Sequence, residues 1–147
     1  MTIKLSTGLR TKMLNGGATG GIKGALDGGN INIYSGPQPL IADTGATGTL
    51  LATVSVAGAG LTFDAAVAGA IAKAAAEDWG YTGLANGTAG WFRFFPAAGD
   101  PSTTSATEAR IDGSIASSGR DMRVATVSIV IGAPNAVHIF KLTLPAQ

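Results

Sequence analysis

The sequence contains no cysteine and only one histidine, His138. The absence of cysteine excludes disulfide bonds, a thiolate nucleophile and zinc held by cysteine. His138 falls in a predicted strand between Val137 and Ile139, a setting typical of a structural or surface histidine. Asp and Glu are dispersed, so the pattern offers neither a convergent ligand set nor a paired acid and base. We therefore expect a protein that is not an enzyme, with no catalytic or metal-ligating residues, no cofactor and no small-molecule substrate.

Charge is also scarce, at 13% of residues against roughly 25% in an ordinary globular domain. The ten Lys and Arg residues are scattered and the net charge is +1, which argues against a nucleic-acid partner, because phosphate binding needs a concentrated basic patch. No apolar run reaches the roughly 18 residues of a membrane span, and the first residues lack the apolar core of a signal peptide. We expect no membrane partner and synthesis in the cytoplasm.

A surface so poor in charge is weakly protected against association. Two interpretations stay open at this point. The chain either associates with a partner or a larger assembly, or it is a small β protein whose surface is mostly Thr, Ser, Asn and Gly. Its 147 residues are the size of one domain.

The most distinctive stretch is 87–96, which holds four of the seven Trp and Phe residues. After a turn framed by two glycines, alternation places Trp91, Arg93 and Phe95 on one face of a strand and Phe92 and Phe94 on the other. Aromatic residues on both faces predict a central strand that is covered on both sides. Arg93 is flanked by aromatic rings and can stack on Trp91 or Phe95. Its stem then covers aromatic surface while its head reaches water, or its head donates a hydrogen bond to a neighbouring subunit.

Residues 1–28 differ from the rest and are predicted to form an N-terminal arm with two short helices. Leu5, Leu9 and Met13 recur at a spacing of four, with Ser6 as N-cap and glycines 16 and 17 as the stop. A second helix carries Ile22 and Leu26 at the same spacing. Such short helices need a surface to lie on, which is either this protein's own β core or a neighbouring subunit.

Residues 29–147 are predicted to form a single β domain. Alternation and turn signals indicate about seven to nine short strands, so the predicted fold is an all-β antiparallel sandwich or a barrel-like domain. The predicted strands are 30–34, 49–56, 69–74, 78–83, 91–95, 109–116 with a bulge at Gly113, 124–131 and 137–144. The Ala-rich stretch 65–77 also fits a helix, and a helix there is the main alternative to the two strands around it.

Four segments together resemble a family of small virion structural proteins of tailed bacteriophages. They are Leu5–Arg10, Ile33–Pro39, Gly87–Phe94 and Arg110–Ile115, spread over most of the chain. None of them is a catalytic signature. The resemblance implies a small, β-rich, cysteine-poor, oligomeric protein of the capsid or tail.

The resemblance further implies a capsid decoration (cement) protein that lies on the capsid surface of the virion. Its expected partners are the major capsid protein and sister copies, in a homo-oligomer that we expect to be a trimer. The predicted partner interface comprises Ile3, Leu5, Leu9, Met13, Leu14 and Arg93. If the arm carries docking, deletion of residues 2–15 is expected to abolish capsid binding and to leave the β domain folded.

Two other functions stay open. One is a tail or baseplate component, including a host-attachment module. The other is a carbohydrate-binding β-sandwich, for which Trp79, Tyr81 and Trp91 would have to be exposed as an aromatic platform.

Overall fold

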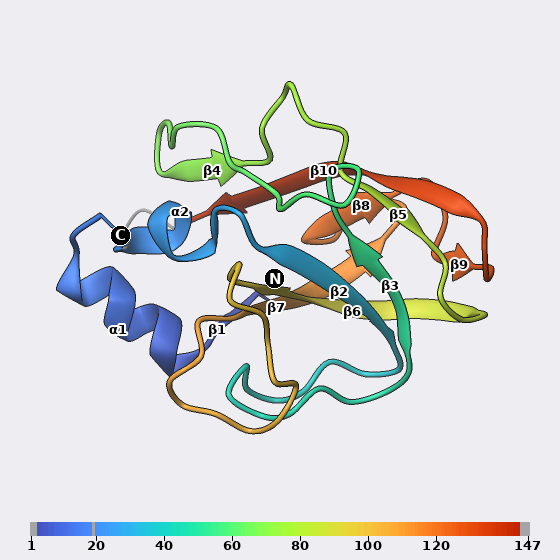
Figure 1. Ribbon diagram of the computed structural model, residues 1–147, viewed down its shortest axis with the longest axis horizontal. Helices are drawn as coiled ribbons and strands as arrows, with labels where there is room; N and C mark the ends of the chain where they lie inside the picture. Colours follow the sequence, from blue (N-terminus) through green and yellow to red (C-terminus); the bar gives the residue numbers. More distant parts are fainter. Residues whose placement is uncertain (1–2, 19, 145–147) are drawn as a thin grey trace.

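The computed structural model describes residues 3–18 and 20–144 and shows a mostly β fold with two short helices near its N-terminus (Figure 1). Its ten strands form one curled sheet, which gives the shape of a half-barrel. The elements are β1 (Lys4–Leu5), α1 (Thr7–Asn15), α2 (Gly21–Leu26), β2 (Asn30–Ser35), β3 (Leu50–Val54), β4 (Ala70–Ala72), β5 (Gly80–Thr82), β6 (Gly87–Phe95), β7 (Ile111–Ala116), β8 (Met122–Val124), β9 (Ser128–Ile129) and β10 (Pro134–Thr143). The predicted all-β, barrel-like class is confirmed.

The main path of the sheet runs β3-β2-β6-β7-β8-β10-β4, and β1, β5 and β9 pair with β7, β10 and β6. The pairs are antiparallel except that β8 runs parallel to β7, so the sheet is mixed and the purely antiparallel prediction needs this correction. Strand β5 returns toward β3, and Ser55 and Gly80 exchange two backbone hydrogen bonds of 2.9 Å there. The amide of Leu84 also donates to the carbonyl of Leu51. These contacts bring the two sides of the half-barrel together along a seam.

Strand β6 is central, as predicted, because it pairs with β2 on one side and β7 on the other. Phe92 and Phe94 point into the half-barrel and are fully buried. They meet an aromatic cluster in which Phe94 lies 5.2 Å from Phe63, 6.0 Å from Trp79 and 5.8 Å from Phe140, between ring centroids. This cluster is the centre of the apolar core.

Gly113 sits opposite Phe92 in a regular part of the β6–β7 ladder, so the predicted bulge at Gly113 is wrong. A Cβ atom at this position would lie 2.6 Å from Cζ of Phe92 and 2.9 Å from Cδ1 of Ile3. The glycine is therefore there to let an aromatic ring pack against the strand.

The Ala-rich stretch contains β4 and no helix, which confirms the two predicted strands around residues 69–74 and 78–83. The amide of Asp64 donates to the carbonyl of Ala72 and the amide of Ala74 donates to the carbonyl of Thr62, so extended pairing prevails over the helix propensity of alanine. The single strand predicted for 124–131 is wrong. The range meets β8 only at Val124 and also contains β9. Because β8 pairs with β7 and β10 whereas β9 pairs with β6, the chain changes partner strands between them.

The N-terminal helices lie on the β core of the same chain, one of the two predicted surfaces. Ser6 caps α1 as expected, with its hydroxyl accepting from the amide of Leu9, and Gly16 ends the helix with φ of 64°. Leu9 and Leu26 are fully buried, while Leu5 belongs to β1 rather than to the helix. The division into an arm (1–28) and a β domain (29–147) stays a prediction, and residues 1–2, 19 and 145–147 of those ranges lie outside the described part.

Candidate interaction surfaces

The face of β6 opposite the aromatic core carries a buried ion cluster, which consists of Arg93, Asp112, Arg110 and Asp100. Arg93 donates from Nε and Nη2 to the two carboxylate oxygens of Asp112, at 2.7 Å each. The two residues face each other in the β6–β7 ladder, and both side chains are fully buried. This bidentate geometry is the strongest form of an arginine–carboxylate pair.

The second pair joins Arg110 to Asp100, with Nε and Nη2 of Arg110 at 2.7 and 2.5 Å from Oδ1 of Asp100. Nη1 of Arg93 lies 3.6 Å from Oδ2 of Asp100, which links the two pairs. Burial by itself would lower the pKa of Arg93, but the hydrogen bonds and charge of Asp112 outweigh it and raise that pKa. Arg93 thus keeps its charge although it is out of water, whereas at Asp112 burial outweighs the hydrogen bonds and charge of Arg93 and raises the pKa of that carboxyl.

The same arginines hold two long loops, the β2–β3 loop (residues 36–49) and the β6–β7 loop (residues 96–110). Arg93 donates to the carbonyl of Thr44 at 2.9 Å, and Arg110 donates to that of Thr103 at 2.8 Å. The two loops lie side by side along the lower edge of Figure 1 and are joined by backbone hydrogen bonds such as Ser105 N–H to Asp43 C=O. The ion cluster therefore stabilises the conformation of these two loops. Arg93, which was predicted to contact a partner, is buried within its own chain.

The other predicted interface residues have diverse surroundings. Leu9 is fully buried in the core, so it presents no surface to a partner. Ile3, Leu5 and Met13 are half-buried and pack against the core. Leu14 is 88% exposed and remains available.

Deletion of residues 2–15 would consequently remove part of the core and also Ser6. The buried hydroxyl of Ser6 accepts from the amide of Arg110 at 2.8 Å and donates to the carbonyl of Glu108 at 2.7 Å. The expectation that the truncated protein keeps a normal β domain is therefore not supported by the packing.

The aromatic residues considered for sugar binding form no platform. Trp79 and Trp91 are fully buried and Tyr81 is 6% exposed. Trp91 stacks on Tyr34 with ring centroids 4.7 Å apart, and Cζ of Arg93 lies 5.4 Å from the centroid of the Trp91 ring. His138 is exposed on β10, and no cluster of three or more potential metal ligands occurs in residues 3–18 and 20–144.

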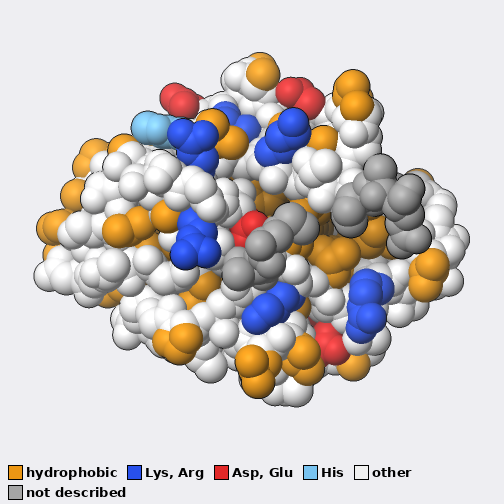
Figure 2. Space-filling model, turned by 180° about the vertical axis from the view of Figure 1, so that it is seen from behind, with side chains coloured by type: hydrophobic (Ala, Val, Ile, Leu, Met, Phe, Trp, Pro, Cys, Tyr) orange, Lys and Arg blue, Asp and Glu red, His pale blue; other side chains and the backbone are white. Residues whose placement is uncertain are grey.

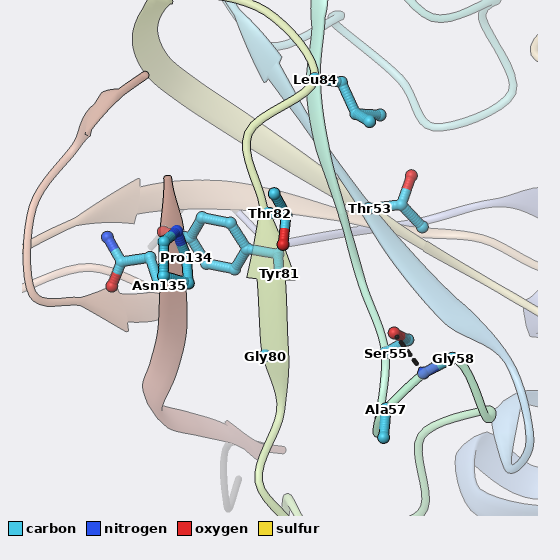
Figure 3. Close-up of a pocket in the computed structure, with 10 residues that line it drawn as sticks. All are labelled: Thr53, Ser55, Ala57, Gly58, Gly80, Tyr81, Thr82, Leu84, Pro134 and Asn135. Carbon is cyan, nitrogen blue, oxygen red and sulfur yellow. Dashed lines mark hydrogen bonds between the residues drawn. The ribbon is translucent and has the colours of Figure 1, made fainter. Parts of the chain in front are cut away.

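One hollow, the seam groove, lies where β3 meets β5 (Figure 3). It has a volume of about 480 Å³ and is lined by the hydroxyl residues Thr53, Ser55 and Thr82 together with Asn135 and Tyr81. None of its lining residues is charged. The Tyr81 hydroxyl is buried without a hydrogen-bond partner, and burial raises the pKa of Tyr81 to about 12, so the phenol is neutral at ordinary pH. The groove offers neutral hydrogen-bonding groups.

A second hollow, the helix hollow, is apolar and lies between the two helices and the ends of β4 and β10. It has a volume of about 350 Å³, and Met13, Ile22, Ile71 and Leu142 form much of its wall. A third hollow, the loop groove, has a volume of about 560 Å³. Its lining residues are Lys4, Leu5, Thr7, Arg10, Leu40, Ile41, Ala42 and Asp43.

Large hydrophobic side chains also stand exposed around the molecule. They are Leu14, Leu40, Ile41, Leu50, Val67, Leu84, Val130, Ile131, Ile139 and Leu144. Figure 2 shows hydrophobic side chains, alanine and proline included, spread over one face, with isolated charged groups between them. The two most exposed are Leu40, at 90%, and Leu14, at 88%.

Comparison with family models, curated proteins and solved structures gave no match to this chain. Within the described part of the chain, neither helix is long and apolar enough to span a membrane.

Sequence reasoning missed the ion cluster as a unit and the exposed pair Leu40 and Ile41. A signal for the cluster existed, because Arg93 and Asp112 are charged residues inside two predicted strands with apolar neighbours. Their pairing depends on the register of β6 against β7, which the sequence pattern does not specify. Leu40 and Ile41 fall in a loop after two prolines, where periodicity gives no information.

Proposed function

We propose that this chain is a non-enzymatic structural protein of a tailed-bacteriophage virion, and that it binds the assembled shell as a decoration protein. The observation that carries the proposal is the surface, on which ten large hydrophobic side chains of residues 3–18 and 20–144 are exposed while only 13% of all residues in the sequence are charged. Burying apolar surface is favourable by about 25 cal/mol per Å². A surface of this composition favours association, and the family resemblance of the sequence gives the setting.

A decoration protein stabilises a shell by mass action, because it binds the assembled form better than the free subunits. This mechanism requires a rigid protein whose surface binds the shell, and it requires no catalytic residues. The half-barrel meets the first need through its aromatic core and its buried ion cluster. The proposed partners are the major capsid protein and sister copies of this chain in a trimer.

The test uses shells of the phage that encodes the chain, assembled without it. Purified protein is added in increasing amounts, and the copies bound per shell and the temperature of shell rupture are measured. We expect saturable binding and a higher rupture temperature. Absence of binding to shells, or location only at the tail in virion images, would contradict the proposal, and the second result would favour a tail or baseplate component.

A further inference from the structure

The sequence contains two Asn–Gly pairs, Asn15–Gly16 and Asn86–Gly87. An asparagine that precedes glycine is prone to deamidation, because glycine has no side chain to hinder the attack of its backbone nitrogen on the asparagine side chain. The attack also requires an asparagine side chain and a backbone that are free to move into position. The surroundings of the two pairs therefore decide which of them reacts.

The first pair lies at the open end of helix α1. Asn15 is the last residue of the helix, and it is exposed together with Gly16 and Gly17. A Cβ atom at either glycine would meet no atom of the described residues within 4 Å, so this backbone is loosely surrounded. The amide of Gly16, which holds the attacking nitrogen, donates to the carbonyl of Lys12 at 3.2 Å, the long end of the usual range. Helix ends fray, so this bond opens readily.

The second pair is held on both of its reacting groups. Oδ1 of Asn86 accepts from the amide of Ile131 at 2.8 Å. Gly87 begins β6 and pairs with Ile129 of β9. A Cβ atom at Gly87 would lie 2.8 Å from Cδ2 of Leu51, so the backbone there is tightly packed. The side chain and the backbone must both leave their partners before they can react.

We propose that Asn15 is a site of spontaneous deamidation and that the fold protects Asn86 from the same reaction. The backbone nitrogen of Gly16 loses its proton and forms a bond to Cγ of Asn15, and the bond from Cγ to Nδ2 breaks and releases ammonia. Water then adds to one of the two carbonyl carbons of the resulting succinimide ring. Opening of the ring leaves either aspartate or isoaspartate. The nucleophile and the leaving group belong to the chain itself, and water is the co-reactant.

The product carries a new carboxylate at the C-terminal end of α1. The formal net charge of the chain falls from +1 to 0, because one neutral amide becomes one carboxylate. A negative charge at this end of a helix is opposed by the helix dipole, and a net charge near zero favours association. This inference is independent of the function proposed above, because the reaction needs no partner.

The experiment follows both pairs in the same protein. The full chain is incubated in mildly alkaline buffer, and peptides that contain Asn15 or Asn86 are analysed over time by mass spectrometry, with chromatography to separate isoaspartate from aspartate. We expect Asn15 to react at least about tenfold faster than Asn86, because Asn86 reacts only after a local opening of its hydrogen bonds. In concentrated denaturant the two rates should become similar, since both pairs are then equally free.

The variant Gly16→Ala tests the route. We expect it to slow the reaction at Asn15 and to leave the rate at Asn86 unchanged, and thermal unfolding checks that the fold is kept. Equal rates at Asn15 and Asn86 in the folded protein, or a faster reaction at Asn86, would overturn the inference. A rate difference that persists in denaturant would also overturn it, because neighbouring sequence instead of the fold would then be the cause. Products without isoaspartate would contradict the succinimide route.

Discussion

The two faces of strand β6 are buried to the same degree by different physical means. Phe92 and Phe94 on one face and Trp91 and Arg93 on the other are all fully buried. The first face packs aromatic rings against rings, whereas the second places Arg93 in a bidentate pair with Asp112 and in hydrogen bonds to loop carbonyls. Strand β6 thus contributes one face to the apolar core and the other face to the contacts that hold two long loops.

Because one face packs by apolar contact and the other by hydrogen bonds, the two faces determine different parts of the structure. Apolar packing is non-directional and stabilises in proportion to the area buried, so it fixes the curl of the sheet without choosing a loop conformation. Hydrogen bonds from a planar guanidinium are directional, and each N–H selects one acceptor. We infer that the aromatic face stabilises the fold, while the charged face sets the conformation of the β2–β3 and β6–β7 loops.

The largest expected effect comes from the aromatic face. Phe94→Ala should lower the free energy of unfolding by about 3–5 kcal/mol, because it removes ring contacts and leaves a cavity between Phe63, Trp79 and Phe140. Denaturant unfolding followed by tryptophan fluorescence measures the change. Phe95→Ala, at the half-buried next position, is the matched control and should have a clearly smaller effect. Equal effects would mean that β6 is not divided into these two faces.

A smaller global effect is expected when both partners of the charged face are replaced. The double variant Arg93→Met/Asp112→Leu should stay within about 2 kcal/mol of the wild type, because apolar residues of similar volume often substitute for a buried ion pair. Asp112→Leu alone should cost about 3–5 kcal/mol, since it leaves Arg93 charged and without its bidentate partner. Equilibrium unfolding of the three proteins tests this. A double variant as unstable as the single one would show that the ion pair itself stabilises the fold.

The smallest expected effect concerns Glu77, a carboxylate at the edge of the aromatic face. Burial alone would raise the pKa of Glu77, but hydrogen bonds from Thr62 and from Nε1 of Trp79 outweigh it and lower that pKa below 4.5. The folded state therefore binds this proton less readily than the unfolded state, so the stabilisation is complete above about pH 4.5 and is lost as pH falls through the folded-state pKa.

The stability difference between wild type and Glu77→Gln should consequently shrink between about pH 7 and pH 3. Unfolding free energies measured across this range give the difference directly. Asp78→Asn, a change at the exposed neighbour, is the control. The same pH dependence in both variants would assign the effect to net charge instead of to the hydrogen bonds of Glu77.

Much of the fold could be predicted from the sequence because its signals are local. The alternation in β6 and the N-cap at Ser6 are properties of a few neighbouring residues, and both are confirmed. The need for glycine at Gly8 and Gly113 could not be predicted from neighbouring residues in the sequence. A Cβ at Gly8 would lie 2.2 Å from the carbonyl oxygen of Thr107, a contact between segments that are far apart in the chain.

The interaction surfaces were less predictable, for a related reason. Leu9 has the same apolar character as Leu14, yet one is fully buried and the other is 88% exposed. Helical spacing marks an apolar stripe but does not say which part of it meets the core. Arg93 illustrates the same limit. Its burial depends on Asp112 and on loop carbonyls such as that of Thr44, which lies 49 residues earlier in the sequence.

Our central claim is that the aromatic face of β6 stabilises the fold while the charged face sets the conformation of the two loops. Amide hydrogen exchange in the Arg93→Met/Asp112→Leu variant tests this claim most directly. Two loop amides report on the charged face, that of Ala46, which donates to Ser102 at 2.9 Å, and that of Ser105, which donates to Asp43 at 2.8 Å. The account predicts that both lose protection while the amides of β6 that pair with β2 and β7 keep theirs. Equal loss in the loops and in β6, or unchanged protection of both loop amides, would contradict it.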